Sequence, residues 1–187
     1  MTAAALPPFP GPGARAARLA QILRVDHAGE LGAVHIYRGQ RAVMNAAPGH
    51  EAAAAQLAEL EAHEARHLAR FDALLTETGA RPTLLAPLWR MAGYALGAGT
   101  ALMGEKAIAA CTEAVETVIE GHYAGQIAEL REREPALAAE LSAFRDDELA
   151  HRDQALQQGA REAPGYALLA GAIRVGCRAA IKLSERL

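Results

Sequence analysis

The motif E-x-x-H occurs twice in this chain, and the repetition restricts the possible fold more than any other feature. Glu64 and His67 form the first copy, and Glu148 and His151 form the second. Residues three apart in a helix lie on one face, so each pair can reach one site. Some four-helix bundles hold two metal ions with two such motifs and one glutamate from each of two further helices. The repetition therefore predicts an all-α four-helix bundle around a carboxylate-rich metal site.

A single glutamate stands at the matching place before each motif. Glu30 precedes the first copy and Glu116 precedes the second by nearly the same length of chain, which suits a helix, a short turn and an antiparallel partner. Tyr37 and Tyr123 each follow the lone glutamate by seven residues, so they lie on its helix face. We therefore expect two copies of one helical hairpin.

The predicted metal ligands are four carboxylates and two imidazoles, namely Glu30, Glu64, His67, Glu116, Glu148 and His151. We expect Glu64 and Glu148 to bridge two ions, and Glu30 and Glu116 to be terminal ligands. Four negative charges balance two divalent cations, so the loaded site can be buried. Donors rich in oxygen suit iron or manganese better than tetrahedral zinc. Two ferrous ions at such a site can use O2 to hydroxylate a C–H bond or to oxidise iron itself.

Other residues compete for these places. His63 turns the first motif into H-E-x-x-H, the signature of zinc proteases, but such an enzyme has no use for the second motif. Five more side chains can each replace a ligand, namely His27, His35, His50, Glu61 and Glu113, the last being the main rival of Glu116. Each ligand histidine also needs a carboxylate on its free N–H, for which the candidates are Asp26, Asp147 and Glu120.

Composition fits one helical domain. The chain has 187 residues and only 4% aromatic residues, and it lacks runs of β-branched side chains. Helices are expected over about 14–45, 51–78, 101–132 and 135–158, with Gly79 as a C-cap and Pro135 in a first turn. The prolines and glycines near the start predict a disordered lead-in over residues 1–13, so the domain covers 14–187. Gly29 and Gly32 predict either close helix approach or a kink in the first helix.

Two segments predict contact with a membrane surface. Residues 84–103 carry Arg90 as their only charge, but a proline and several glycines interrupt them, so we expect an interfacial segment rather than a span. Residues 164–187 place four basic side chains at intervals of four, namely Arg174, Arg178, Lys182 and Arg186, opposite Leu168, Leu169, Ile173 and Ile181. This pattern is typical of an amphipathic helix on anionic lipid, and the alternative is the solvated face of an ordinary bundle helix.

Charge and cysteine content argue against several classes. The net charge of −3 gives no basic surface for general binding of nucleic acid. Cys111 and Cys177 lie far apart in the sequence and form no C-x-x-C motif, which fits inert packing thiols in a reducing compartment. Residues 1–24 contain arginines and no acid, yet lack the apolar core of a secretory signal. We expect a cytoplasmic protein, with an organellar one as the alternative.

Several segments resemble the demethoxyubiquinone hydroxylase family. They are LRVDHAGE at 23–30, IYRGQ at 36–40, RPTLLAPLW at 81–89, ALGAGT at 95–100, ACT at 110–112, FRDDEL at 144–149 and LSERL at 183–187. The resemblance implies a ferritin-like di-iron monooxygenase that uses O2 to hydroxylate a polyprenylated methoxy-benzoquinol in the penultimate step of ubiquinone biosynthesis. It implies NADH as an electron donor and peripheral attachment to the cytoplasmic face of the cell membrane, or to the mitochondrial inner membrane in a eukaryote.

The resemblance also implies roles for individual residues. The family's ligand positions match the six predicted ligands one by one, which favours Glu116 over Glu113. His122 and Tyr123 match a pair beside the substrate pocket, and Asp26, Tyr37 and Asp147 are further candidates around the site. The pattern departs at His35 and His63, neither of which belongs to the ligand set. A lipid-presenting protein or a second copy of the chain is a possible partner.

Two further functions share the ligand pattern. An iron-storage or ferroxidase bundle needs no interfacial helix, and a di-iron hydroxylase of tRNA needs a basic patch at the mouth of its site. The apolar segment and the basic stripe favour the quinol hydroxylase over both.

Overall fold

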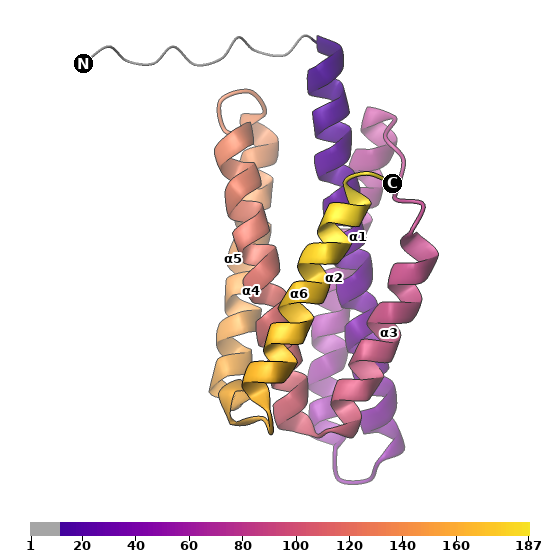
Figure 1. Ribbon diagram of the computed structural model, residues 1–187, viewed down its shortest axis with the longest axis vertical. Helices are drawn as coiled ribbons and strands as arrows, with labels where there is room; N and C mark the ends of the chain where they lie inside the picture. The colour runs from indigo at the N-terminus through magenta and orange to yellow at the C-terminus, as the bar shows by residue number, and fades with distance from the viewer. Residues whose placement is uncertain (1–11) are drawn as a thin grey trace, which may run out of the picture.

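Four long helices form the bundle in this computed structural model, which describes residues 12–187 (Figure 1). All regular structure in that range is helical, and the elements are α1 (Pro12–Ala46), α2 (Glu51–Thr78), α3 (Ala86–Leu102), α4 (Glu105–Leu130), α5 (Pro135–Gln157), the short 3-10 helix η1 (Ala160–Glu162) and α6 (Tyr166–Ser184). The predicted disordered lead-in lies outside the described residues, except for Pro12 and Gly13, which begin α1.

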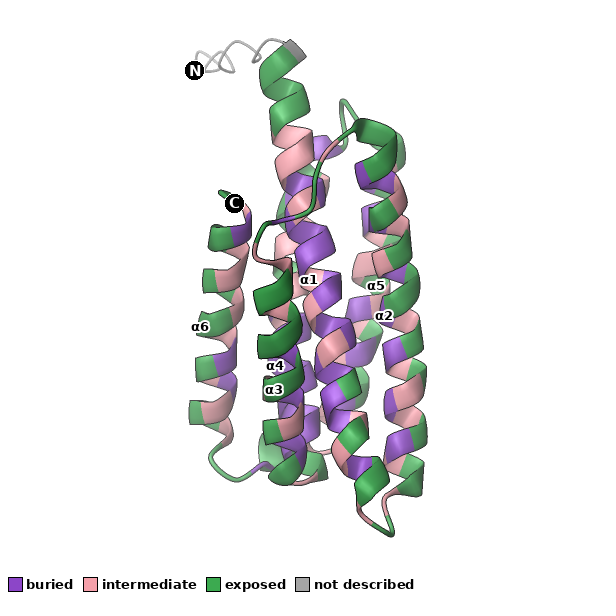
Figure 2. Ribbon diagram, turned by 90° about the vertical axis from the view of Figure 1, so that its right-hand side faces the viewer, coloured by how far each residue is buried: buried purple, intermediate pink, exposed green. Residues whose placement is uncertain are grey.

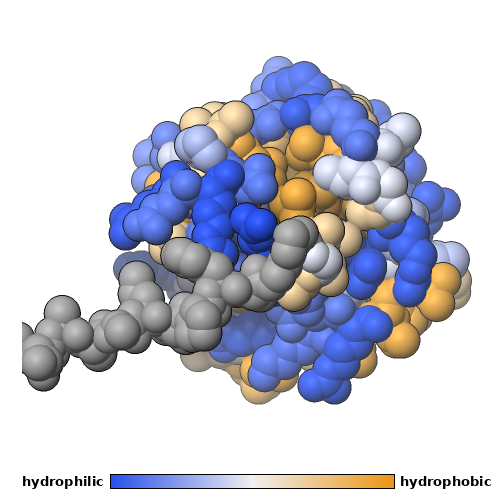
Figure 3. Space-filling view, turned by 90° about the horizontal axis from the view of Figure 1, so that it is seen from above, coloured by the Kyte–Doolittle hydropathy of each residue, from blue (hydrophilic) through white to orange (hydrophobic). Residues whose placement is uncertain are grey.

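The duplication covers three helices in each half of the chain. The antiparallel pairs α1–α2 and α4–α5 are the two predicted hairpins, and each is followed by a shorter helix. The helix α3 packs along α1, and α6 packs along α4. Figure 2 places α3 and α6 on the same side of the bundle. On the face seen from above, hydrophobic residues lie near the centre with mostly hydrophilic residues around them (Figure 3).

Local sequence signals set most helix ends where they were predicted. Gly79 adopts the left-handed conformation with φ of 67° and ends α2, and Pro135 occupies the first turn of α5. The prediction of one helix over 101–132 was wrong at its start, because α4 begins at Glu105. Gly104, with φ of 100°, separates α4 from α3, so the apolar segment forms a helix of its own. The 3-10 helix was not predicted.

Glycines allow α3 to lie directly against α1, but they are not the glycines that were expected. A Cβ atom added to Gly97 would lie 2.0 Å from the carbonyl oxygen of Ile36, and one added to Gly39 would lie 2.3 Å from that of Tyr94. A Cβ atom on Gly29 would meet nothing within 4 Å. Close approach is therefore built mainly by glycines of α3, and Gly29 instead faces open space.

An apolar cavity of about 500 Å³ lies between α1, α3, α4 and α6. Its wall contains Gly29 and Gly32 from α1 and Val115 and Ile119 from α4, and aliphatic side chains supply most of the rest. The missing side chains of the two glycines leave room on the α1 side. The helix α6 covers the cavity, and its Ser184 hydroxyl accepts a hydrogen bond from the Trp89 indole at 2.9 Å.

The predicted basic stripe on α6 is divided by the fold. Arg174 turns inward, where its guanidinium lies 2.7 Å from the Glu113 carboxylate and anchors α6 to α4. The other three basic residues are exposed, namely Arg178, Lys182 and Arg186. Leu168 is 80% exposed, although it was predicted to lie on the apolar side with Ile173, which is buried. Among the described residues, no helix is both long and apolar enough to cross a membrane.

Candidate metal centre

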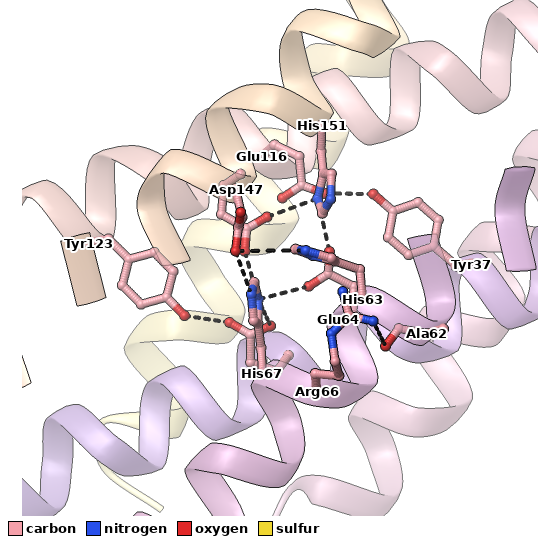
Figure 4. Close-up of polar contacts among 12 residues, drawn as sticks. Tyr37, Ala62, His63, Glu64, Arg66, His67, Glu116, Tyr123, Asp147 and His151 are labelled. Atoms are coloured by element: carbon pink, nitrogen blue, oxygen red, sulfur yellow. Dashed lines mark hydrogen bonds and ion pairs between the residues drawn. The ribbon is translucent and has the colours of Figure 1, made fainter. Parts of the chain in front are cut away.

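The six predicted ligands meet in the middle of the bundle, and every one of them is buried. Figure 4 labels four of them, namely Glu64, His67, Glu116 and His151. The helices α1 and α4 supply one glutamate each, and α2 and α5 supply one E-x-x-H motif each. Their donor atoms form two overlapping groups within 4.8 Å: one is Glu30, Glu64, His67 and Glu148, and the other is Glu64, Glu116, Glu148 and His151. Glu64 and Glu148 belong to both groups, which is the position expected of bridging carboxylates.

Two tyrosines link the halves of the centre by crossed hydrogen bonds. The Tyr37 hydroxyl on α1 donates to Glu116 Oε1 on α4 at 2.8 Å, and the Tyr123 hydroxyl on α4 donates to Glu30 Oε1 on α1. Each tyrosine therefore binds the lone glutamate of the other hairpin rather than its own. The predicted repeat thus gives an approximately twofold arrangement, with one tyrosine fixing one terminal carboxylate in each half.

Both ligand histidines turn Nδ1 towards the carboxylates. His67 Nδ1 lies 3.3 Å from Glu148 Oε1 and 3.6 Å from Glu30 Oε2, and His151 Nδ1 lies 3.0 Å from Glu64 Oε1. On the other side of the first ring, His67 Nε2 lies 3.2 Å from the carboxylate of Asp147. Asp147 is thus the one candidate of the three that contacts a predicted ligand histidine.

The remaining candidate carboxylates face elsewhere. Glu120 accepts hydrogen bonds from Arg145, and Asp26 Oδ1 accepts one from the Gln126 amide at 2.7 Å. The same Gln126 nitrogen lies 2.8 Å from His122 Nε2, so the residue predicted beside the substrate pocket joins this buried pair. Sequence reasoning missed Gln126. The repeat contained a signal for it, because Gln40 and Gln126, both buried, each follow the lone glutamate of their half by ten residues.

The two halves differ around their histidines. Phe144 packs against His67 with ring centroids 4.3 Å apart, and Asp147 binds the outer nitrogen of that ring. The His63 ring contacts both histidines, with its centroid 4.9 Å from that of His67 and 4.8 Å from that of His151. Among residues 12–187, the carboxylates within 4.0 Å of the His151 ring are those of Glu64 and Glu148, and both are paired with Nδ1. His63 precedes Glu64 just as Asp147 precedes Glu148, so the repeat has a carboxylate at this place in one half only.

Burial and crowding perturb the pKa values of the cluster. Burial raises the pKa of Glu30 and of Glu116 well above the ordinary range. Burial acts in the same direction on Glu64, but the two histidines outweigh it and lower that pKa to about 2. Burial opposes the charging of His151, yet Glu148 and Glu64 raise its pKa to about 9. Without metal, protons therefore reduce the repulsion among the buried carboxylates.

The donor atoms fit a pair of divalent cations. Seven of them are buried without a hydrogen-bond partner, namely Glu30 Oε2, Glu64 Oε1, Glu116 Oε2, both carboxylate oxygens of Glu148, His67 Nδ1 and His151 Nδ1. Buried polar atoms that lack partners are costly, and these all point into one small region. Bound cations would satisfy them and balance the four negative charges, so the residues present suit a dinuclear metal site.

The rival ligands all face other partners. Glu113 binds Arg174 and accepts a hydrogen bond from the Tyr166 hydroxyl at 2.9 Å. The others are held by Asp72 for His27, the Leu31 carbonyl for His35, Glu105 for His50, and Arg38 with Arg41 for Glu61. His63 lies beside the centre and joins Glu64 and His67 in a third group of close donor atoms. That group shares Glu64 and His67 with the dinuclear set. A zinc protease would use this group alone and would leave the second E-x-x-H motif without a role.

A second cavity reaches the centre from the end of the bundle where α4 begins and α5 ends. It has a volume of about 300 Å³, and His151 forms part of its wall. Half of its lining residues are polar, namely Gln56, Glu105, Thr112, His151, Gln154 and Gln158. The apolar cavity, in contrast, has none of the six ligands in its wall. The polar cavity therefore borders a predicted ligand directly, whereas the apolar cavity runs beside the centre without reaching one.

Known proteins similar to this chain are quinone hydroxylases. Residues 17–184 match the family described as "Ubiquinone biosynthesis protein COQ7". The chain is 50% identical over 179 residues to "3-demethoxyubiquinol 3-hydroxylase" of Rhodospirillum rubrum, covering 96% of this chain and 83% of the relative. It is 47% identical to the human "NADPH-dependent 3-demethoxyubiquinone 3-hydroxylase, mitochondrial", covering 89% and 77%, and 40% identical to the yeast "5-demethoxyubiquinone hydroxylase, mitochondrial", covering 93% and 80%.

Proposed function

Because the chain belongs to the COQ7 family of ubiquinone biosynthesis proteins, we infer that it hydroxylates a demethoxyubiquinol. The enzyme is an oxidoreductase that replaces a ring C–H by C–OH. In balanced form, the ring C–H, O2, two electrons and two protons give the ring C–OH and water. The observation that carries the proposal is the cluster of six buried ligands, whose unpartnered donor atoms converge from four helices.

Two iron ions are the cofactor that these residues would hold. Glu30 and His67 would bind one ion, Glu116 and His151 would bind the other, and Glu64 and Glu148 would bridge them. When bound, the ions supply the activation of O2. The chain's own residues fix the ligands: the tyrosine hydroxyls orient the terminal carboxylates, and Asp147 orients the His67 ring. Burial of the whole set limits the contact of the site with bulk water to the side that His151 lines.

The apolar cavity suits the prenyl tail of the substrate. Its wall is made of glycines and aliphatic side chains, which match a hydrocarbon and offer little to a polar ligand. Gly29 and Val115 line it, and the residues that follow them in the chain are the terminal ligands Glu30 and Glu116. A tail bound in this cavity would therefore place the quinol ring beside the metal centre, between α1 and α4.

Attachment to a membrane surface follows from the side of the molecule that carries α3 and α6. Large apolar side chains are exposed there, including Met91 and Leu102 on α3 and Leu168 and Val175 on α6. Three exposed basic residues of the α6 end complement anionic lipid, namely Arg178, Lys182 and Arg186. Peripheral attachment by this side would let a lipid substrate enter the apolar cavity without leaving the bilayer. In a bacterium this surface would be the cytoplasmic face of the cell membrane.

The electron donor is a reduced nicotinamide cofactor. The resemblance implies NADH, whereas the names of the human and mouse relatives specify NADPH. Both deliver two electrons, as the balanced reaction requires. Oxygen consumption by the loaded enzyme, with each donor supplied separately, distinguishes them.

The test of the function is the quinone profile of a strain that lacks the gene. Mass spectrometry of its lipid extract should show a ubiquinone precursor that lacks one methoxy group. The wild-type chain should remove this precursor, and Glu148→Ala should leave it. Asp153→Ala is the control, because Asp153 lies on the same helix as Glu148 but is exposed and pairs with its neighbour Arg152. An unchanged quinone pool would instead favour ferroxidase or tRNA chemistry.

A further inference from the structure

The polar cavity beside His151 has the form of a passage from solvent to the metal centre. Its polar residues are exposed at one end, where Glu105, Gln154 and Gln158 lie, and become buried towards Thr112 and His151. Thr112 stands one turn before the terminal ligand Glu116 on α4, so the two share a helix face. Polar groups thus continue from the surface to the ligands.

Neither of the two cavities has His67 or Glu30, the ligands of the other half, in its wall. The ring of His67 is covered by Phe144, and its outer nitrogen is bound to Asp147. The apolar cavity runs along α1 and α4 without touching any of the six ligands. The approach to His151 is therefore the polar one, and the approach along α3 and α6 is apolar.

A divalent cation needs polar groups along its way into a protein. It sheds bound water at great cost unless carbonyl, carboxylate or imidazole donors replace that water. Amide oxygens of Gln56 and Gln154 and the hydroxyl of Thr112 offer such donors, whereas an aliphatic wall offers none. The buried carboxylates at the inner end of the cavity attract the cation, and His151 Nδ1 lies there without a hydrogen-bond partner.

We propose that this polar cavity is the entrance through which hydrated divalent cations reach the metal centre. The inference rests on the proposed function, because it requires the six residues to bind metal. It assigns separate entrances to the cofactor ions and to the substrate, with cations entering beside His151 and the prenylated quinol entering beneath α6. The first ion would meet the Glu116–His151 half before the Glu30–His67 half.

The test is the rate at which the metal-free full-length protein takes up Co2+, followed by visible absorption in a stopped-flow instrument. The variant Gln56→Leu/Gln154→Leu makes the entrance apolar at similar side-chain size, and Ala53→Trp fills it. Ala53 is half-buried in the cavity wall, so the larger side chain has solvent on one side. Uptake should slow about tenfold in both variants. The final number of ions per chain should stay the same.

The control narrows the other cavity. Gly176→Leu adds a side chain to the apolar wall, where an added Cβ meets nothing within 4 Å, and it should load Co2+ at the wild-type rate. Normal uptake in both entrance variants, or slowed uptake in Gly176→Leu, would overturn the proposal. A wild-type protein that binds no Co2+ pair at equilibrium would instead refute the metal centre, and the entrance with it. Circular dichroism of each variant establishes that it is folded.

Discussion

The two halves of the metal centre contain the same ligands but have different surroundings. In each half a glutamate, an E-x-x-H motif and a tyrosine from the opposite hairpin occupy equivalent places. Asp147 and Phe144 contact His67, His63 contacts both histidines, and a polar cavity borders His151. The ligand set is therefore kept in both copies of the repeat, while the residues around it differ. We call the half with Glu30 and His67 the enclosed half, and the half with Glu116 and His151, which borders the polar cavity, the open half.

Removing a bridging carboxylate should have the largest effect, because Glu148 belongs to both groups of ligand atoms. Glu148→Ala should lose both ions and all hydroxylation. Glu30→Ala should lose the ion of the enclosed half and keep one in the open half. Metal analysis of the purified proteins by mass spectrometry measures this difference. Equal loss in the two variants would mean that the halves do not bind independently.

The carboxylate beside His67 offers the sharpest test of the difference between the halves. Asp147→Asn should weaken metal binding in the enclosed half by about 10- to 100-fold, since a ligand histidine loses its charged partner. His63→Asp gives the open half the residue that the enclosed half has, and it should tighten binding there. Calorimetric titration with Mn2+ resolves the two binding steps. The comparison would fail if Asp147→Asn left both affinities unchanged.

The outer helices are held by different means, and this too can be measured. The helix α3 touches the α1 backbone at Gly97, while α6 is tied to α4 by the Arg174–Glu113 ion pair. Gly97→Ala should lower the free energy of unfolding by about 1–3 kcal/mol, because its Cβ has no room beside the Ile36 carbonyl. Gly99→Ala, where the space is open, should instead raise it by about 0.5–1 kcal/mol. Urea denaturation provides both values, and equal effects would contradict the packing argument.

The smallest expected effect is a gradual loss of stability with pH in the metal-free protein. The pKa of His151 rises from 6.5 to about 9 on folding, so its contribution is complete below pH 6.5 and is lost as the pH rises through 9. The raised pKa values of Glu30 and Glu116 act in the same direction above pH 4.5. Thermal unfolding followed by circular dichroism should give a midpoint that falls between pH 6.5 and 9.

Metal binding should reduce this pH dependence, because ligands bound to cations carry no proton that can be lost. The lowered pKa of Glu64 opposes the trend only below pH 4.5, outside the interval tested. A midpoint of the metal-free protein that rises between pH 6.5 and 9 would contradict the proton-bound cluster.

Spacing within single helices was enough to predict the four bundle helices, their repeat and the six candidate ligands. Glu64 and His67 share a face by helical periodicity alone, and Gly79 and Pro135 mark helix ends through their own backbone preferences. The similarity of the two halves of the chain was also predicted from the spacing of these residues. The role of the six residues as metal ligands remains a prediction.

Contacts between helices could not be predicted from the sequence and are known only from the tertiary structure. Tyr37 and Glu116 are 79 residues apart, and nothing in the sequence showed that each tyrosine would bind the glutamate of the other hairpin. Arg174 was placed on a surface stripe by its spacing, but the position of Glu113 on α4 turned it inward. The entrance beside His151 exists only because the ends of α2, α4 and α5 come together. Periodicity specifies which face a residue occupies, whereas packing specifies what that face meets.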